Sequence, residues 1–73
     1  MTLEQKLQLL ATTLESEPQN LRLDLPLDSL EEWDSLARIS LIGMFSKSFG
    51  RKISADVLKS FVKVQDIVDE MHE

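Results

Sequence analysis

Apolar side chains recur at helical spacing over the first sixteen residues of the chain. Thr2 and Gln5 have the types and separation of a capping box, in which each side chain accepts a hydrogen bond from the other residue's backbone N–H. A stripe of leucines follows at intervals of three and four, formed by Leu3, Leu7, Leu10 and Leu14. The pattern predicts an amphipathic helix that ends near Ser16, because Pro18 disfavours helical geometry in the residue before it.

The segment 17–33 carries conflicting signals. Leucines alternate with other residues from Leu21 to Leu27, which is the pattern of a half-buried strand. The chain offers no second convincing strand to pair with it, and Pro26 lacks the N–H that a sheet ladder uses. We therefore predict an extended loop whose alternate leucines fill gaps between helices.

The longest helical pattern follows this loop, from about Ser35 to Ser48, and Gly50 supplies a C-terminal stop. On a helical wheel its predicted core face comprises Ile39, Leu41, Ile42, Phe45 and Phe49. The opposite side of the wheel carries Leu36, Ser40, Gly43 and Lys47. This helix would therefore have one buried face and one face open to partners.

Two shorter helices are expected after Gly50. Ser54 has the residue type of an N-cap for a short third helix, and an apolar stripe predicts a last helix from about Val64 to Met71. Lys63, just before that helix, is a poor cap. The fold class predicted from these patterns is all-α: a four-helix bundle with a long first loop and a short third helix, forming one domain over residues 1–73.

Composition excludes several classes of function. The chain has 73 residues, no cysteine, a single histidine and a net charge of −5. That charge opposes nucleic-acid binding, and a lone histidine without cysteine provides no catalytic triad, thiol nucleophile or metal site. No apolar run approaches the length of a membrane span. We expect a monomeric, cytoplasmic protein that binds neither nucleic acid nor membrane nor metal and has no catalytic residues.

Asp34 and Ser35 lie where the loop gives way to the longest helical pattern. Both residue types favour helix N-termini, because their oxygens accept hydrogen bonds from unpaired backbone N–H groups. From the residues alone two interpretations are open: a helix cap, which is much the commoner use, or a serine that carries a phosphate-linked group. The second suits the position, since free N–H groups and the helix dipole favour an anion there.

The run from Asp34 to Gly50, DSLARISLIGMFSKSFG, resembles the second helix of acyl carrier proteins, and Val64-Gln65-Asp66 continues the resemblance. In that family the serine of Asp-Ser-Leu carries a 4′-phosphopantetheine arm derived from coenzyme A. The resemblance therefore implies covalent attachment of this cofactor to Ser35, with Asp34 and Leu36 flanking it. It also implies a carrier that is not an enzyme and that tethers acyl intermediates as thioesters.

The same resemblance implies the partners: a phosphopantetheinyl transferase, which brings its own magnesium, an acyl- or aminoacyl-activating ligase, and a downstream synthase or transferase. A second Asp-Ser-Leu triplet, which contains Ser29, lies six residues earlier. Ser35 is preferred, because only its triplet opens a sustained helical pattern and lies the family's distance ahead of Phe49-Gly50. Ser29 is expected to cap a turn.

Partner enzymes are expected to dock beside the attached serine, on Leu36, Ala37, Ser40, Gly43 and Lys47. Fatty-acid members of the family show acidic residues on this helix, whereas the side chains here are apolar, small or basic. This departure favours a specialised biosynthetic pathway over bulk fatty-acid elongation, with partners selected by shape and apolar contact. Two alternatives stay open: an aminoacyl or peptidyl carrier protein, and an unmodified helical interaction module with the carrier fold.

Overall fold

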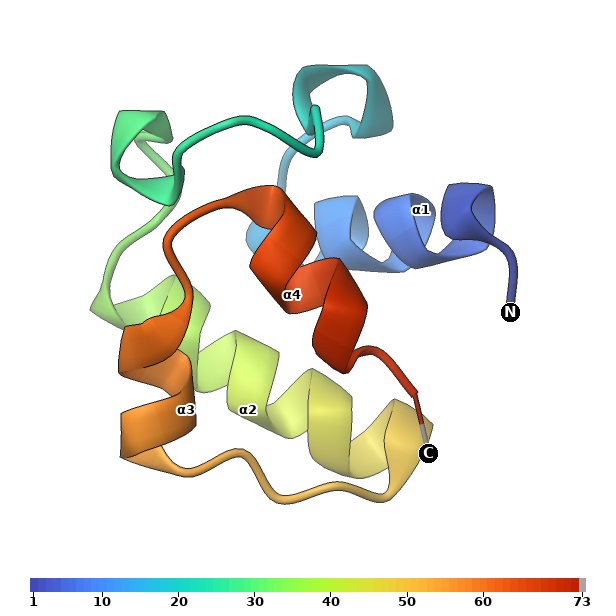
Figure 1. The fold of residues 1–73 in the computed structure, drawn as a ribbon, viewed down its shortest axis with the longest axis vertical. Coiled ribbons are helices and arrows are strands. Elements are labelled where there is room, and N and C mark those ends of the chain that lie inside the picture. The colour runs from blue at the N-terminus through green and yellow to red at the C-terminus, as the bar shows by residue number, and fades with distance from the viewer. Residues whose placement is uncertain (73) are drawn as a thin grey trace.

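The computed structural model describes residues 1–72, and its regular structure is helical. The elements are the helices α1 (Leu3–Leu14), α2 (Ser35–Phe49), α3 (Ala55–Ser60) and α4 (Val64–Glu70), with two 3₁₀ turns, η1 (Pro18–Asn20) and η2 (Leu27–Ser29). Figure 1 shows α1, α2 and α4 gathered around one centre, with the short α3 beside the N-terminal half of α2. The predicted all-α fold with a long first loop and a short third helix is confirmed.

The helix ends follow the cap residues in the sequence. The capping box of α1 is present, since the backbone N–H of Gln5 donates to Thr2 Oγ1 over 3.1 Å and that of Thr2 donates to Gln5 Oε1 over 2.8 Å. The helix ends at Leu14, two residues earlier than predicted, because Glu15 adopts a left-handed conformation with φ 55°. Gly50 ends α2 in the same way, with φ 64°, a conformation that glycine adopts without strain.

The entry to α4 is stabilised by Asp66 rather than by its N-cap residue. The side chain of Lys63 makes no capping hydrogen bond, as its residue type predicts. The carboxylate of Asp66 instead accepts hydrogen bonds from the backbone N–H groups of Val62, over 2.9 Å, and Lys63, over 3.1 Å. These two hydrogen bonds lower the pKa of the Asp66 carboxyl group, and the bond from Val62 has the larger effect.

The long first loop is extended, and its leucines fill gaps as predicted. Leu21 and Leu27 are each only 1% exposed. The alternating pattern also has a partner that the sequence did not reveal: the backbone N–H of Leu27 donates to the Val62 carbonyl over 2.8 Å, and the N–H of Val64 donates to the Leu25 carbonyl over 3.1 Å. Pro26 lies between these bonds in a single antiparallel bridge and is tolerated because the bridge uses the N–H groups of its neighbours.

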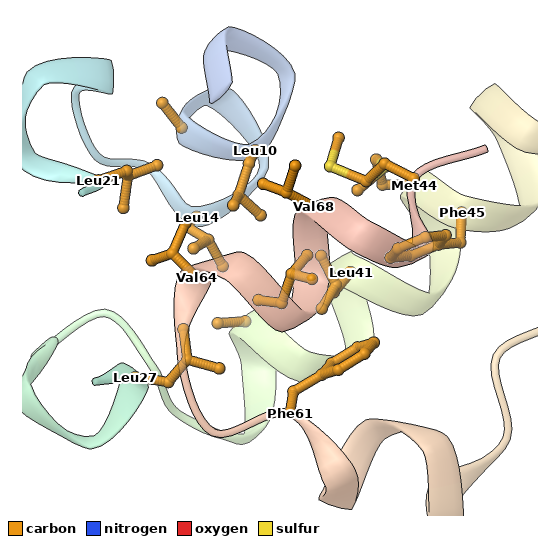
Figure 2. Packing of buried hydrophobic residues seen from close by; sticks show 14 of the residues in the cluster. Leu10, Leu14, Leu21, Leu27, Leu41, Met44, Phe45, Phe61, Val64 and Val68 are labelled. Atoms are coloured by element: carbon orange, nitrogen blue, oxygen red, sulfur yellow. The ribbon is translucent and has the colours of Figure 1, made fainter. Parts of the chain in front are cut away.

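One apolar cluster forms the core, and Phe45 of α2 is the largest of its fully buried side chains. Phe45 is fully buried, with its ring centroid 5.7 Å from that of Phe49 and 6.5 Å from that of Phe61. Figure 2 shows side chains from α1, α2, α4 and the first loop directed into the same space. Leu41 is also fully buried, and Ile42 is half-buried at the edge.

Two positions differ from the predicted core faces. Ile39 was expected in the core and is 65% exposed, so that prediction is wrong, whereas Ala37 and Met44 are each only 7% exposed. On the helical wheel Ala37 and Met44 lie beside Leu41, on the side opposite to Ile39. The buried face of α2 is therefore centred further from Ile39 than predicted. On α1 the stripe is buried at its C-terminal end, while Leu3 at the other end is 48% exposed.

Candidate functional site

The N-terminus of α2 is capped by Asp34. The backbone N–H of Ala37 donates to Asp34 Oδ1 over 2.8 Å, and Asp34 has the extended backbone of an N-cap residue. Ser35 is therefore the first residue of the helix rather than its cap. The alternative that assigned Ser35 a capping role is wrong, because the neighbouring carboxylate already accepts the hydrogen bond that a cap would accept.

The side chain of Ser35 is exposed and unengaged. Within residues 1–72 its hydroxyl makes no hydrogen bond, and the backbone N–H groups of Ser35 and Leu36 have no acceptor. Such unpaired N–H groups are normal in the first turn of a helix, and they face the end at which the helix dipole is positive. A group attached to Ser35 Oγ would break no existing contact and would meet donors suited to an anion.

The other candidate, Ser29, lies in a different environment. It ends the 3₁₀ turn η2, and its hydroxyl donates to the Pro26 carbonyl over 2.6 Å. A substituent on Ser29 Oγ would remove that hydrogen bond from a turn in which three residues are already constrained. Ser29 serves as a turn residue, as its sequence context predicted.

Two open grooves lie on either side of the α2 N-terminus. One, of about 260 Å³, is lined by the end of α1 and by residues that include Asp34, Leu36 and Ser40. The other, of about 400 Å³, separates the start of α2 from α3 and is lined by residues that include Trp33 and Arg38. The attached group could therefore lie along either side of the helix without displacing buried side chains.

The indole of Trp33 fixes the position of an arginine one turn beyond Ser35. The guanidinium carbon of Arg38 lies 5.4 Å from the Trp33 ring centroid, within cation–π distance. Arg38 remains exposed despite this contact. The sequence alone does not indicate this contact between Arg38 and Trp33 beside the site.

The outward side of α2 contains four of the five residues predicted to dock partners. Leu36 is 72% exposed, and Ser40, Gly43 and Lys47 are exposed with it. Ala37 is buried, so its methyl group offers a partner almost no surface and we exclude it from this side. Ile39 replaces it, since one helical turn separates Ile39 from Ser35 and Gly43. The sequence feature that could have indicated this replacement of Ala37 by Ile39 is the pair Ala37 and Met44, which lie on the flank of the helical wheel away from Ile39.

The described part of the chain offers little for other chemistry. Over residues 1–72 no group of three or more His, Asp or Glu side chains is arranged to hold a metal ion. No helix among those residues is both long and apolar enough to cross a membrane. The domain presents an exposed serine with an unengaged hydroxyl at the N-terminus of α2, with an apolar surface next to it.

Comparison with known families identifies this class of domain. The profile of the family described as "Phosphopantetheine attachment site" matches residues 7–71. The chain therefore belongs to the phosphopantetheine-binding carrier family, whose members are non-catalytic and carry 4′-phosphopantetheine covalently on a serine. Searches of curated proteins and of solved structures returned no significant match.

Proposed function

We propose that Ser35 is the serine of this chain that carries the 4′-phosphopantetheine arm. The observation that supports this assignment is the exposed, unengaged hydroxyl of Ser35 at the N-terminus of α2, left free because Asp34 caps the helix. Ser29 is the weaker candidate, since its hydroxyl already bonds to the Pro26 carbonyl.

The chemistry of attachment suits this position. A bond forms between Ser35 Oγ and a phosphorus atom of coenzyme A, the pyrophosphate bond of coenzyme A breaks, and adenosine 3′,5′-bisphosphate leaves as the hydroxyl proton is lost. The resulting phosphodiester would lie next to the unpaired N–H groups of Ser35 and Leu36, at the positive end of the helix dipole. Asp34 caps the first turn of α2, and we expect the transferase to recognise this residue beside the serine.

The carrier role follows from the arm. A ligase loads an acyl or aminoacyl group on the thiol of the arm as a thioester, and a synthase or transferase then removes or extends it. The protein contributes no catalytic residue to these steps; its flexible tether raises the effective concentration of the thioester at each enzyme that it visits. We place this function in a specialised biosynthetic pathway in the cytoplasm.

The docking surface of the proposed carrier is the outward side of α2. It comprises Leu36, Ile39, Ser40, Gly43 and Lys47, all exposed and all within four turns of Ser35. Two of these side chains, Leu36 and Ile39, are large and apolar, and they are 72% and 65% exposed. Exposed apolar side chains next to an attachment point are suited to burial against partner enzymes.

Intact-mass measurement tests the assignment directly. The protein is incubated with coenzyme A, magnesium and a phosphopantetheinyl transferase of broad specificity. We expect the wild type and the matched control Ser29→Ala to gain the mass of one phosphopantetheine, and Ser35→Ala to gain none. Modification of Ser35→Ala but not of Ser29→Ala would transfer the assignment to the other triplet. An unmodified wild type would favour the helical interaction module instead.

A further inference from the structure

The basic side chains of this acidic protein are concentrated in one part of it. Residues 35–63, which span α2, α3 and the first residues after α3, hold six Lys and Arg side chains and a single carboxylate, Asp56, so their formal net charge is +5. The whole chain has a net charge of −5. The carboxylates therefore lie almost entirely in α1, the first loop and α4.

Five of these six cations have no ion pair among the described residues, and of the five only Lys63 acts on an internal carboxylate, since its charge helps to lower the pKa of Asp66. Within residues 1–72 no carboxylate lies at ion-pair distance from Arg38, Lys47, Lys52 or Lys59. Arg51 differs from them, because its Nη1 lies 2.8 Å from Glu70 Oε2 and it also donates to the Glu70 carbonyl. Within the fold, Arg51 pairs with Glu70 and Lys63 acts on Asp66, whereas Arg38, Lys47, Lys52 and Lys59 stay available to a partner.

Two of these cations border the groove beside the site of the arm. Arg38 and Lys59 line the groove between α2 and α3, together with the apolar side chains of Leu58 and Val62. Figure 1 shows α3 beside the start of α2, with the link that contains Lys52 running between the far end of α2 and α3. On the opposite side of Ser35 the charge is negative, since the other groove is lined by three carboxylates: Glu15, Glu32 and Asp34.

We propose that the α2–α3 surface, defined by Arg38 and Lys59 on the lining of the groove between these helices, docks an acidic surface on the enzymes that receive the arm. This inference rests on the proposed function of Ser35 and adds the electrostatic character of the partner. The fitting partner has carboxylates around an apolar depression at the entrance to its active site, which would accept Leu36 and Ile39. The negative groove on the other side of Ser35 fixes the orientation of the partner about the arm, because a rotated partner would bring like charges together.

A protein partner fits this surface better than an anionic membrane or a nucleic acid. The positive region is local, it is bordered by the carboxylates of the other groove, and the net charge of the chain repels an extended polyanion. At physiological salt the screening length is about 8 Å, so only groups that come close to Arg38 and Lys59 gain from them. A contoured protein surface can reach these side chains while avoiding Asp28, which lines the same groove.

A charge-reversal experiment with a surrogate partner tests the proposal. The probe is a ketosynthase with Lys and Arg around its carrier entrance, compared with a variant in which those residues are Glu. The carrier arm bears an electrophilic analogue that crosslinks to the catalytic cysteine, and the crosslinking rate is measured. We expect the wild-type carrier to react about tenfold faster with the acidic-entrance variant at low salt, and the difference to shrink as salt rises.

Variants of the carrier then identify the groups responsible. Arg38→Glu and, separately, Lys59→Glu should each lose most of the preference, and Lys59→Glu does so without disturbing the Trp33 contact. Arg22→Glu is the matched control: it makes the same change in net charge at an exposed residue of the first loop whose ion pair with Asp24, over 3.4 Å, is also exposed. Arg22→Glu should keep the preference.

The outcomes separate this inference from the proposed function. If intact mass shows no arm on the wild-type protein, the proposed function fails. If the arm is present but the wild type reacts equally with both enzymes, or faster with the basic entrance, the acidic-partner inference fails while the carrier function stands. Sedimentation of the wild type with phosphatidylglycerol vesicles at physiological salt, abolished by Arg38→Glu, would also overturn it, because the surface would then serve a membrane. Turnover of a small pantetheine thioester confirms that the altered ketosynthase is active.

Discussion

Truncation of Phe45 should remove a large fraction of the stability of the domain. The side chain is fully buried and its ring lies 5.7 Å from Phe49 and 6.5 Å from Phe61 between centroids. Replacing a buried phenylalanine by alanine destabilises by about 3–5 kcal/mol, and a lost aromatic pair adds about 0.5–1.5 kcal/mol. A domain of this size has a total stability of roughly 4–11 kcal/mol. Phe45→Ala is therefore expected to be marginally folded or unfolded at room temperature.

The measurement is urea unfolding followed by far-UV circular dichroism, with a thermal melt alongside. Where Phe45→Ala still folds, its melting temperature should fall by at least about 12 °C, because 1 kcal/mol corresponds to about 4–8 °C in a domain of this length. Ile39→Ala is the matched control in the same helix. It removes a large apolar side chain that is 65% exposed, so its stability should change by no more than about 0.5 kcal/mol.

The comparison decides which face of α2 is buried. A Phe45→Ala variant that melts with the wild type would refute the full burial of this ring. An Ile39→Ala variant that loses more than about 2 kcal/mol would show that Ile39 packs in the core, as the helical wheel suggested, and would contradict the exposed docking surface. Equal losses in both variants would mean that α2 is buried on both faces.

Two further substitutions test the local hydrogen bonds. Asp34→Ala should destabilise by about 0.5–2 kcal/mol in urea unfolding, because it removes the N-cap of α2, whereas Ser35→Ala should be close to neutral; a larger loss in Ser35→Ala would assign the cap to the serine. Asp66→Asn should destabilise near neutral pH, and its difference from the wild type should shrink as the pH falls through and below about 4. The folded state lowers the pKa of Asp66, so the stability from its carboxylate is present above the ordinary pKa and is lost on protonation. A difference that is constant with pH would contradict this role.

The helices and the proposed attachment point could be predicted from the sequence because both depend on short-range signals. The capping box at Thr2, the glycine stop at Gly50 and the cap at Ser54 each act within a few residues of the chain, and each lies where it was expected. The triplet that contains Ser35 was distinguishable from the one that contains Ser29 by the helical pattern that follows it. None of these features depends on which segments of the chain pack together in the fold.

The features that were missed depend on contacts between distant segments. The pairing of the first loop with residues 62–65 joins backbone groups 35 to 42 positions apart, and the sequence of residues 62–65 shows no convincing strand pattern. The orientation of α2 was misjudged for a related reason. Large apolar side chains occur on more than one face of α2, so they do not by themselves show which face is buried. The buried face is the one that includes Ala37 and Met44. The contact between Trp33 and Arg38 likewise becomes evident only when the loop end is placed beside α2.

The same contacts between distant segments explain how a short chain can hold the helix end that carries the serine in a defined position. The carboxylate of Asp66 binds the backbone N–H of Val62, and the Val62 carbonyl in turn accepts from Leu27 in the first loop. This chain of hydrogen bonds connects the start of α4 to the loop that leads into the α2 N-terminus, where Asp34 holds the first turn. Ser35 itself takes no part in any of these bonds. The fold can therefore position the attachment point through its neighbours, and attachment of the arm to Ser35 would leave every one of those contacts in place.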